Sequence, residues 1–141
     1  MFFGEFDYQI DGKNRFRVPV KLKEVLSGGA YLTKGPNGCL FIIDKKEFDR
    51  LAEKFTDCSI FDQSAMFDKR LFFSSASDAT PDGQGRILLT KNLLEFAQIK
   101  KDIVFIGVDD HVELWAKEKY TEYLSESKKA SKAKVKQNEN V

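Results

Sequence analysis

The feature that most constrains this chain is a motif that occurs twice, 71 residues apart. It reads Asp-Gly-Lys-Asn-Arg over residues 11–15 and Asp-Gly-Gln-Gly-Arg over residues 82–86. The similarity continues beyond the motif at offsets of 71 and 72 residues. The further matched pairs are Leu22 with Leu93, Gly35 with Gly107, Leu40 with Val112, Ile42 with Leu114 and Phe48 with Tyr120. An internal repeat of this length fixes the architecture, because each copy must form the same structural unit.

The two copies predict the same run of elements. Within residues 2–10, Phe6, Tyr8 and Ile10 alternate with Glu5, Asp7 and Gln9, which is typical of a strand with one buried face. The first copy continues with strands over 14–19, 31–33 and 40–43 and helices over 20–26, 44–55 and 62–72. The second copy has strands over 73–80, 85–90, 103–106 and 112–115 and helices over 92–98 and 117–124.

Neither half carries enough apolar surface to fold alone, so we expect the halves to close around a pseudo-two-fold axis. The predicted fold class is α+β, a tandem pseudo-two-fold repeat of a small β-β-α-β-β-α unit. The first repeat spans residues 1–72 and the second spans residues 73–124. Residues 125–141 hold five lysines, two glutamates and no apolar period, so we expect a Lys-rich disordered tail.

Composition is that of an ordinary globular domain, with 42% hydrophobic and 32% charged residues among 141. Cys39 and Cys58 have no metal-binding or redox spacing, which indicates reduced thiols. Glu5 and Asp7 leave no room for a basic signal-peptide start, and no apolar run approaches the ~20 residues of a membrane span. We therefore expect a cytoplasmic protein that does not enter a membrane.

Catalysis is not expected from this sequence. His111 is the single histidine, and it has no second ligand or nucleophile at a useful spacing. The glycines of the two motifs lack the context of a phosphate-binding loop or a dinucleotide fingerprint. We predict no catalytic residue, no metal site, no cofactor and no small-molecule substrate.

The two motifs predict similar turns. Asp11 and Asp82 are expected to accept backbone N–H groups, and Gly12 and Gly83 to supply the positive φ of a tight hairpin. Each motif arginine can pair with the aspartate of its own turn. This structural role is the preferred interpretation for Arg86, although a DNA contact by Arg86 stays open.

The first copy is much more basic than the second. Lys13, Arg15 and Arg17 follow a period of two, which would place them on one strand face. Residues 11–23 carry a net charge of +4, whereas residues 82–94 carry +1. Cations lined up in this way can bind phosphates, and arginine can read a guanine edge. We predict DNA contacts by Lys13, Arg15 and Arg17, and a solvated charged strand is the alternative.

These motifs together resemble the MraZ family. The resemblance covers residues 1–124 and rests on Met-Phe-x-Gly at residues 1–4, on Asp11-x-Lys13-x-Arg15 with Pro19, on Asp82-Gly83-x-Gly85-Arg86 and on Glu113-Leu114-Trp115. The chain departs from the family pattern at Asn14, where the family usually has glycine, and at Thr90, where it usually has proline. Asparagine tolerates left-handed φ better than most residues, so the first turn is expected to form.

The resemblance implies a fold and a function. The fold would be an AbrB-like swapped-hairpin core of β-barrel type with peripheral helices. The function would be sequence-specific transcriptional regulation of the division and cell-wall gene cluster. Such proteins form ring-like homo-oligomers, associate with the nucleoid and bind short direct repeats in double-stranded promoter DNA. A protein-interaction module with the same fold, such as an antitoxin-like protein or a scaffold, is the alternative.

Overall fold

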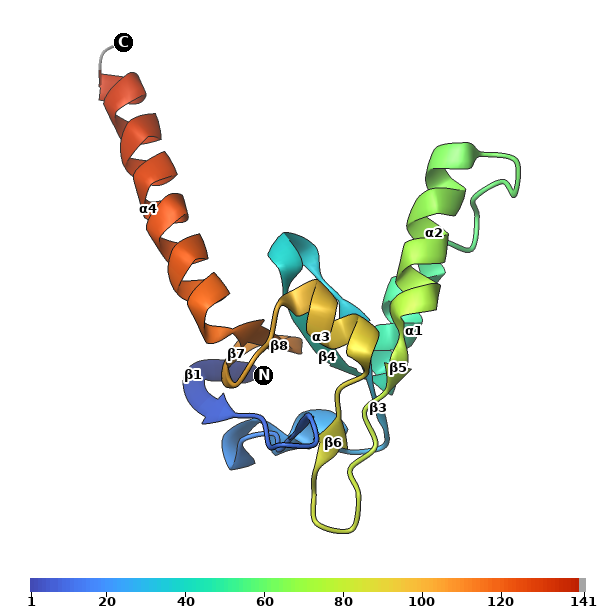
Figure 1. Cartoon of the computed structure of the whole chain (residues 1–141). Helices are drawn as coiled ribbons and strands as arrows, with labels where there is room; N and C mark the ends of the chain where they lie inside the picture. Colours follow the sequence, from blue (N-terminus) through green and yellow to red (C-terminus); the bar gives the residue numbers. More distant parts are fainter. Residues whose placement is uncertain (140–141) are drawn as a thin grey trace.

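The computed structural model describes the backbone of residues 1–139, with side chains described through residue 131 (Figure 1). The strands are β1 (Phe2–Gln9), β2 (Arg15–Phe16), β3 (Ala30–Lys34), β4 (Leu40–Asp44), β5 (Ser77–Asp78), β6 (Ile87–Leu88), β7 (Asp102–Asp109) and β8 (His111–Ala116). The α-helices are α1 (Lys45–Glu53), α2 (Gln63–Ser75), α3 (Lys91–Ala97) and α4 (Lys117–Glu139). Two 3-10 segments, η1 (Val20–Leu26) and η2 (Pro36–Gly38), complete the described chain.

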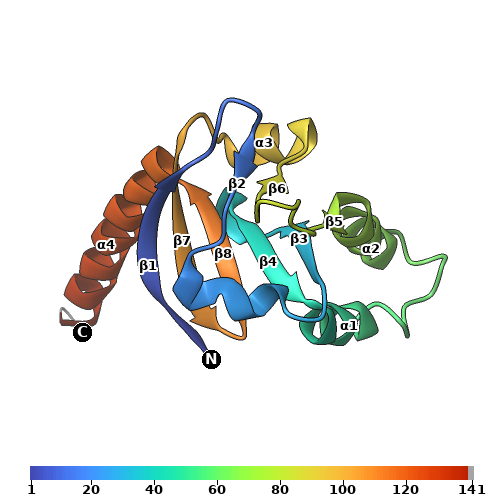
Figure 2. The same ribbon diagram turned by 90° about the horizontal axis from the view of Figure 1, so that it is seen from below.

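Six strands form one antiparallel sheet in the order β1-β7-β8-β4-β3-β5, and β2 pairs with β6 in a separate two-stranded ribbon (Figure 2). Strands β1 to β4 of the first half correspond to β5 to β8 of the second half. When each strand is replaced by its counterpart, the same order results, read from the other edge of the sheet. The predicted α+β class and tandem repeat are therefore confirmed.

The two halves share their strands. The first strand of each half pairs with the third strand of the other half, as β1 pairs with β7 and β5 pairs with β3. The β1–β7 ladder is the longest of these, with eight paired residues from Phe2–Asp109 to Gln9–Asp102. Because of this exchange, neither repeat keeps a complete sheet of its own.

Side chains from both repeats fill one core between the sheet and the ribbon. Phe105 of β7 is fully buried and contacts Tyr8 of β1 and Phe16 of β2, with ring centroids 5.7 Å apart in both pairs. Leu22 and Val25 hold η1 onto the same core. The ribbon and η1 are thus fixed against the sheet by apolar packing.

The expected strand over 73–80 is only two residues long, because α2 continues through Ser75. Phe72 and Phe73 pack on Phe48 and Phe55, with centroid distances between 5.1 and 6.3 Å within this cluster. Aromatic packing of this kind outweighs a local preference for strand. The ribbon strands are also shorter than the predicted 14–19 and 85–90.

Over residues 125–139 the expected disorder of the C-terminal tail differs from the structure, in which α4 runs without a break through Glu139; residues 140–141 of the expected tail lie outside the described residues. The ring of Trp115 packs against those of Tyr120 and Tyr123, with centroid distances of 5.2 and 5.0 Å. This packing fixes the first turns of the helix. Once those turns exist, lysine, glutamate and alanine extend a helix at little cost. The distal part projects away from the core (Figure 1).

His111 has a structural environment at the start of β8. Its Nδ1 lies 2.8 Å from Asp110 Oδ1, and its Nε2 lies 3.5 Å from Glu113 Oε2. Its ring packs against that of Phe41, with the two centroids 4.4 Å apart. The hydrogen bond with Glu113, followed by that with Asp110, raises the pKa of His111 above its ordinary 6.5 in spite of burial.

The raised pKa predicts a pH-dependent stability. The charged imidazole stabilises the folded state, so its contribution is complete below the unfolded pKa near 6.5 and is lost as the pH rises through the higher folded pKa. We expect the melting temperature to fall as the pH rises above 6.5, and His111→Gln to remove this part of the dependence. An equally steep fall in His111→Gln, measured by circular dichroism, would contradict the assignment.

Candidate nucleic-acid interface

The two motifs form matching turns. In the first, Asp11 Oδ1 accepts the N–H groups of Lys13 and Arg15, both at 2.9 Å. In the second, Asp82 Oδ1 accepts those of Gln84 and Arg86, also at 2.9 Å. Each turn is closed by a backbone bond from the aspartate N–H to the arginine carbonyl, at 2.9 and 2.8 Å. A single carboxylate therefore fixes the backbone of each turn.

The positive φ of each turn lies at its fourth residue. Asn14 has φ of 62° and Gly85 has φ of 78°, whereas Gly12 and Gly83 have no positive φ. The expected role of Gly12 and Gly83 is therefore wrong. The turn is a four-residue bend whose last residue is left-handed, a common hairpin geometry in which only that residue needs glycine or asparagine.

Ion pairs join the two turns across the pseudo-two-fold axis. Arg15 Nε lies 2.9 Å from Asp11 Oδ2, and Arg15 Nη1 lies 3.7 Å from Asp82 Oδ2. Arg86 Nε lies 3.4 Å from the same Asp82 oxygen. The backbone N–H of Arg15 is the main cause of a lowered pKa at Asp11, as that of Arg86 is at Asp82. Both aspartates therefore stay ionised at neutral pH, and Arg15 links one turn to the other.

The ribbon presents its other face to solvent. In register, Arg15 lies opposite Leu88 and Phe16 lies opposite Ile87. Phe16 and Ile87 are buried in the core, so Arg17 and Leu88 are left on the outer side, where both are exposed. The alternation of a strand thus holds for Arg15 and Arg17.

The predicted three-residue stripe is only partly formed. Lys13 is exposed but lies in the turn, where left-handed Asn14 separates it from β2, so strand periodicity does not place it with the two arginines. Arg15, Arg17 and Arg86 line one open hollow of about 490 Å³. Arg86 comes from the second repeat, so the structure adds a cation that the basic stretch of the first repeat did not contain.

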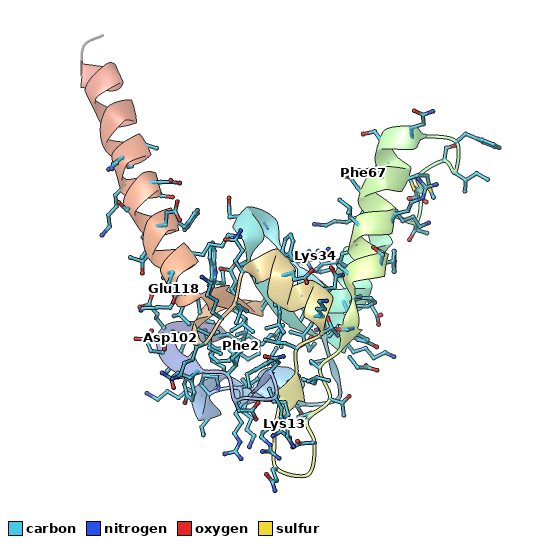
Figure 3. The ribbon with its side chains drawn as sticks, in the orientation of Figure 1. Phe2, Lys13, Lys34, Phe67, Asp102 and Glu118 are labelled. Carbon is cyan, nitrogen blue, oxygen red and sulfur yellow. The ribbon has the colours of Figure 1, made fainter. Side chains whose placement is uncertain are left out.

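Further cations extend this surface. Lys21 and Lys23 are exposed on η1. Within residues 1–131, Lys13, Arg17, Lys21 and Lys23 make no ion pair with a carboxylate. The helices α2 and α4 project from one end of the molecule, and Lys13 lies at the opposite end (Figure 3). We call this surface, made of Lys13, Arg15, Arg17, Lys21, Lys23, Arg86 and Leu88, the basic face.

The residue that sequence reasoning missed here is Leu88. It was visible only as the neutral counterpart of Arg17 at an offset of 71 residues. Its exposed side chain could have been inferred from its position between two apolar neighbours, Ile87 and Leu89, if both are buried.

Other kinds of site are not seen in the described part of the chain. No group of three His, Cys, Asp or Glu side chains is placed to hold a metal ion there. Cys39 is fully buried, and burial is the main cause that raises the pKa of its thiol to about 12. Among the helices up to Glu139, none combines the length and the apolar content needed to cross a membrane.

Comparison with known proteins identifies the family of this chain. The model of the MraZ protein family, whose description suggests a likeness to antitoxins, matches residues 1–71 and again residues 72–140. A protein of Clostridium acetobutylicum is 41% identical over 127 residues, which is 90% of this chain and 89% of the relative. One from Symbiobacterium thermophilum is 43% identical over 124 residues, covering 88% and 90%. Both are named "Transcriptional regulator MraZ", a name that denotes regulation and not catalysis. The two matches and the level of identity show that this chain belongs to the MraZ family.

Proposed function

We propose that this protein is a transcriptional regulator that binds double-stranded promoter DNA selectively through the basic face. The observation that carries the proposal is a set of exposed cations beside the ribbon that have no carboxylate partner within residues 1–131. The names of its relatives support the regulatory role. A two-stranded antiparallel ribbon has the width that the major groove admits, so β2 and β6 can approach base edges.

The cations have different roles in this proposal. Lys13 and Arg17 contact DNA directly, because neither is held by a carboxylate. Arg15 and Arg86 set the shape of the two turns through Asp11 and Asp82, and their remaining N–H groups face the same hollow. Contacts to phosphates would position the protein, and contacts to base edges would give selectivity.

Assembly is part of the same proposal. A few phosphate contacts bind DNA weakly at physiological salt, and linked copies on tandem sites raise the apparent affinity through effective concentration. We propose a ring-like homo-oligomer that binds short direct repeats upstream of its own operon, in the division and cell-wall gene cluster, and that associates with the nucleoid. The exchange of strands between repeats supports the swapped-hairpin description of each subunit's core.

An apolar surface on α2 supports assembly with a second copy of this chain. Four large apolar side chains are exposed there and in the preceding loop: Ile60, Phe61, Phe67 and Leu71. Phe61 is 87% exposed. Together they expose on the order of 500 Å² of apolar area, at about 200 Å² for a fully exposed side chain. A stable interface buries about 800 Å² on each partner, so this surface is large enough to form most of one.

The double substitution Phe61→Ser with Phe67→Ser should dissociate the assembly. Both side chains are largely exposed, so their loss removes interface area and leaves the core intact. We expect light scattering to show a reduced mass, while the far-UV circular dichroism spectrum of the folded subunit stays unchanged. Val20→Ser is the matched control, since Val20 is equally exposed but lies on η1. An unchanged mass in the double variant would rule out α2 as the interface.

The test of the proposed function is binding of the full-length protein to DNA from upstream of its own gene, measured by fluorescence anisotropy. A scrambled duplex and a salt series run beside it. We expect selective binding whose affinity falls steeply with salt. Equal, weak binding to both duplexes would refute the proposal. In that case α2 would direct the search toward a protein partner, which is the antitoxin-like or scaffold alternative.

A further inference from the structure

Leu88 is out of place on the basic face. It is 59% exposed, whereas its neighbours Ile87 and Leu89 are buried, so the strand directs its side chain outward. In the ribbon it lies directly opposite Arg15. The side chain that sits among the arginines of an open polar surface is therefore a large apolar one.

The pseudo-two-fold axis makes this position informative. The ribbon places equivalent residues at its two ends, and Leu88 is the equivalent of Arg17. In the same way, Gln84 is the equivalent of Lys13. The β2 side of the ribbon thus offers cations, and the β6 side offers an apolar and a neutral polar group at the equivalent positions. A subunit of this kind cannot read a palindrome with equal contacts at its two ends.

We propose that Leu88 determines specificity by packing against the 5-methyl group of a thymine in the major groove. This inference rests on the proposed function. Among the four bases, only thymine presents an apolar group in the major groove, its 5-methyl, and an apolar side chain can pack against it. A leucine cannot contact phosphate favourably, so its position on this face is useful for reading bases rather than for electrostatic attraction.

The register also suggests where the thymine lies. Arg17 and Leu88 are diagonal neighbours across the ribbon, and such residues are roughly 7–8 Å apart. Successive bases on one strand rise by about 3.4 Å. The thymine read by Leu88 is therefore placed about two base-pair steps from the base pair or phosphate that Arg17 contacts, and the subunit reads its half-site in one direction.

The experiment removes either partner of the contact. Wild-type protein and Leu88→Ser are titrated with the upstream duplex and with the same duplex containing uracil in place of thymine, which lacks only the methyl groups. We expect uracil to weaken wild-type binding about threefold to tenfold. We expect Leu88→Ser to bind the thymine duplex with a similar loss and to show no further loss with uracil.

Controls separate this contact from general effects. Val108→Ser removes an exposed apolar side chain from β7, away from the ribbon, and should keep the wild-type response to uracil. Unchanged wild-type binding to the uracil duplex, or equal sensitivity to uracil in Leu88→Ser, would overturn the inference while the proposed function stands. Wild-type binding without any preference over scrambled DNA would overturn both.

Discussion

Arg17→Ala is expected to lower the affinity for the upstream DNA by about 5- to 150-fold, which corresponds to the 1–3 kcal/mol typical of an arginine contact to a base. The slope of log affinity against log salt should also become shallower by about one. Arg17 is exposed on the ribbon and has no carboxylate partner within residues 1–131, so the melting temperature should not change. Anisotropy over a salt series, with thermal unfolding beside it, measures all three quantities.

Lys45→Ala is the matched control for this variant. It removes one exposed positive charge from the first turn of α1, outside the basic face, and should leave selective binding intact. If Lys45→Ala and Arg17→Ala weaken binding equally, the effect comes from net charge and not from a contact. If Arg17→Ala binds as tightly as the wild type, the ribbon does not face the DNA.

Arg15 illustrates how the structure changes an expectation drawn from sequence. From the basic stretch alone, Arg15→Ala would be expected to lose DNA binding and to keep the fold. In the structure, Arg15 pairs with Asp11 and also with Asp82 of the other repeat. Its removal should therefore disturb both turns, so a loss of binding in Arg15→Ala would not by itself identify a DNA contact.

Local sequence signals predicted the parts of the fold that depend on local chemistry. The repeated motif identified both turns, and Asn14 was expected to accept the left-handed conformation that it adopts at φ of 62°. The strand over 2–10 and the strand near 112–115 were predicted from alternation or apolar runs. The tandem repeat followed from matched positions along the chain.

Features that depend on distant residues were not predicted. No local pattern states that β1 pairs with β7 of the other repeat, because a strand's periodicity fixes its buried face and not its neighbour. The aromatic cluster that keeps residues 73–75 helical is formed by side chains far apart in sequence. The same limit applies to the basic face, where Arg86 and Leu88 join the cations of the first repeat only after strand exchange.

Gly107→Ala should have the largest effect on stability. Gly107 of β7 lies opposite Gly4 of β1, and a Cβ at position 107 would stand 2.3 Å from the backbone nitrogen of Phe3 and 2.7 Å from the carbonyl carbon of Phe2. Backbone atoms cannot move aside as a flexible side chain can. The β1–β7 ladder must open at the third of its eight pairs, and we expect a loss of about 3 kcal/mol or more in the free energy of unfolding.

Gly83→Ala is the matched control, because a Cβ there meets no atom within 4 Å and the residue has no positive φ. Its free energy of unfolding in denaturant should stay within about 0.5 kcal/mol of the wild type. Gly35→Ala should fall between the two, since its Cβ meets side-chain atoms of Cys39 and Phe41 at 2.8 Å. Gly35 and Gly107 are equivalent in the repeat, but only Gly107 lies against a strand of the other repeat. A larger loss at Gly107 would agree with a backbone clash inside the ladder between the repeats, and equal losses would contradict it.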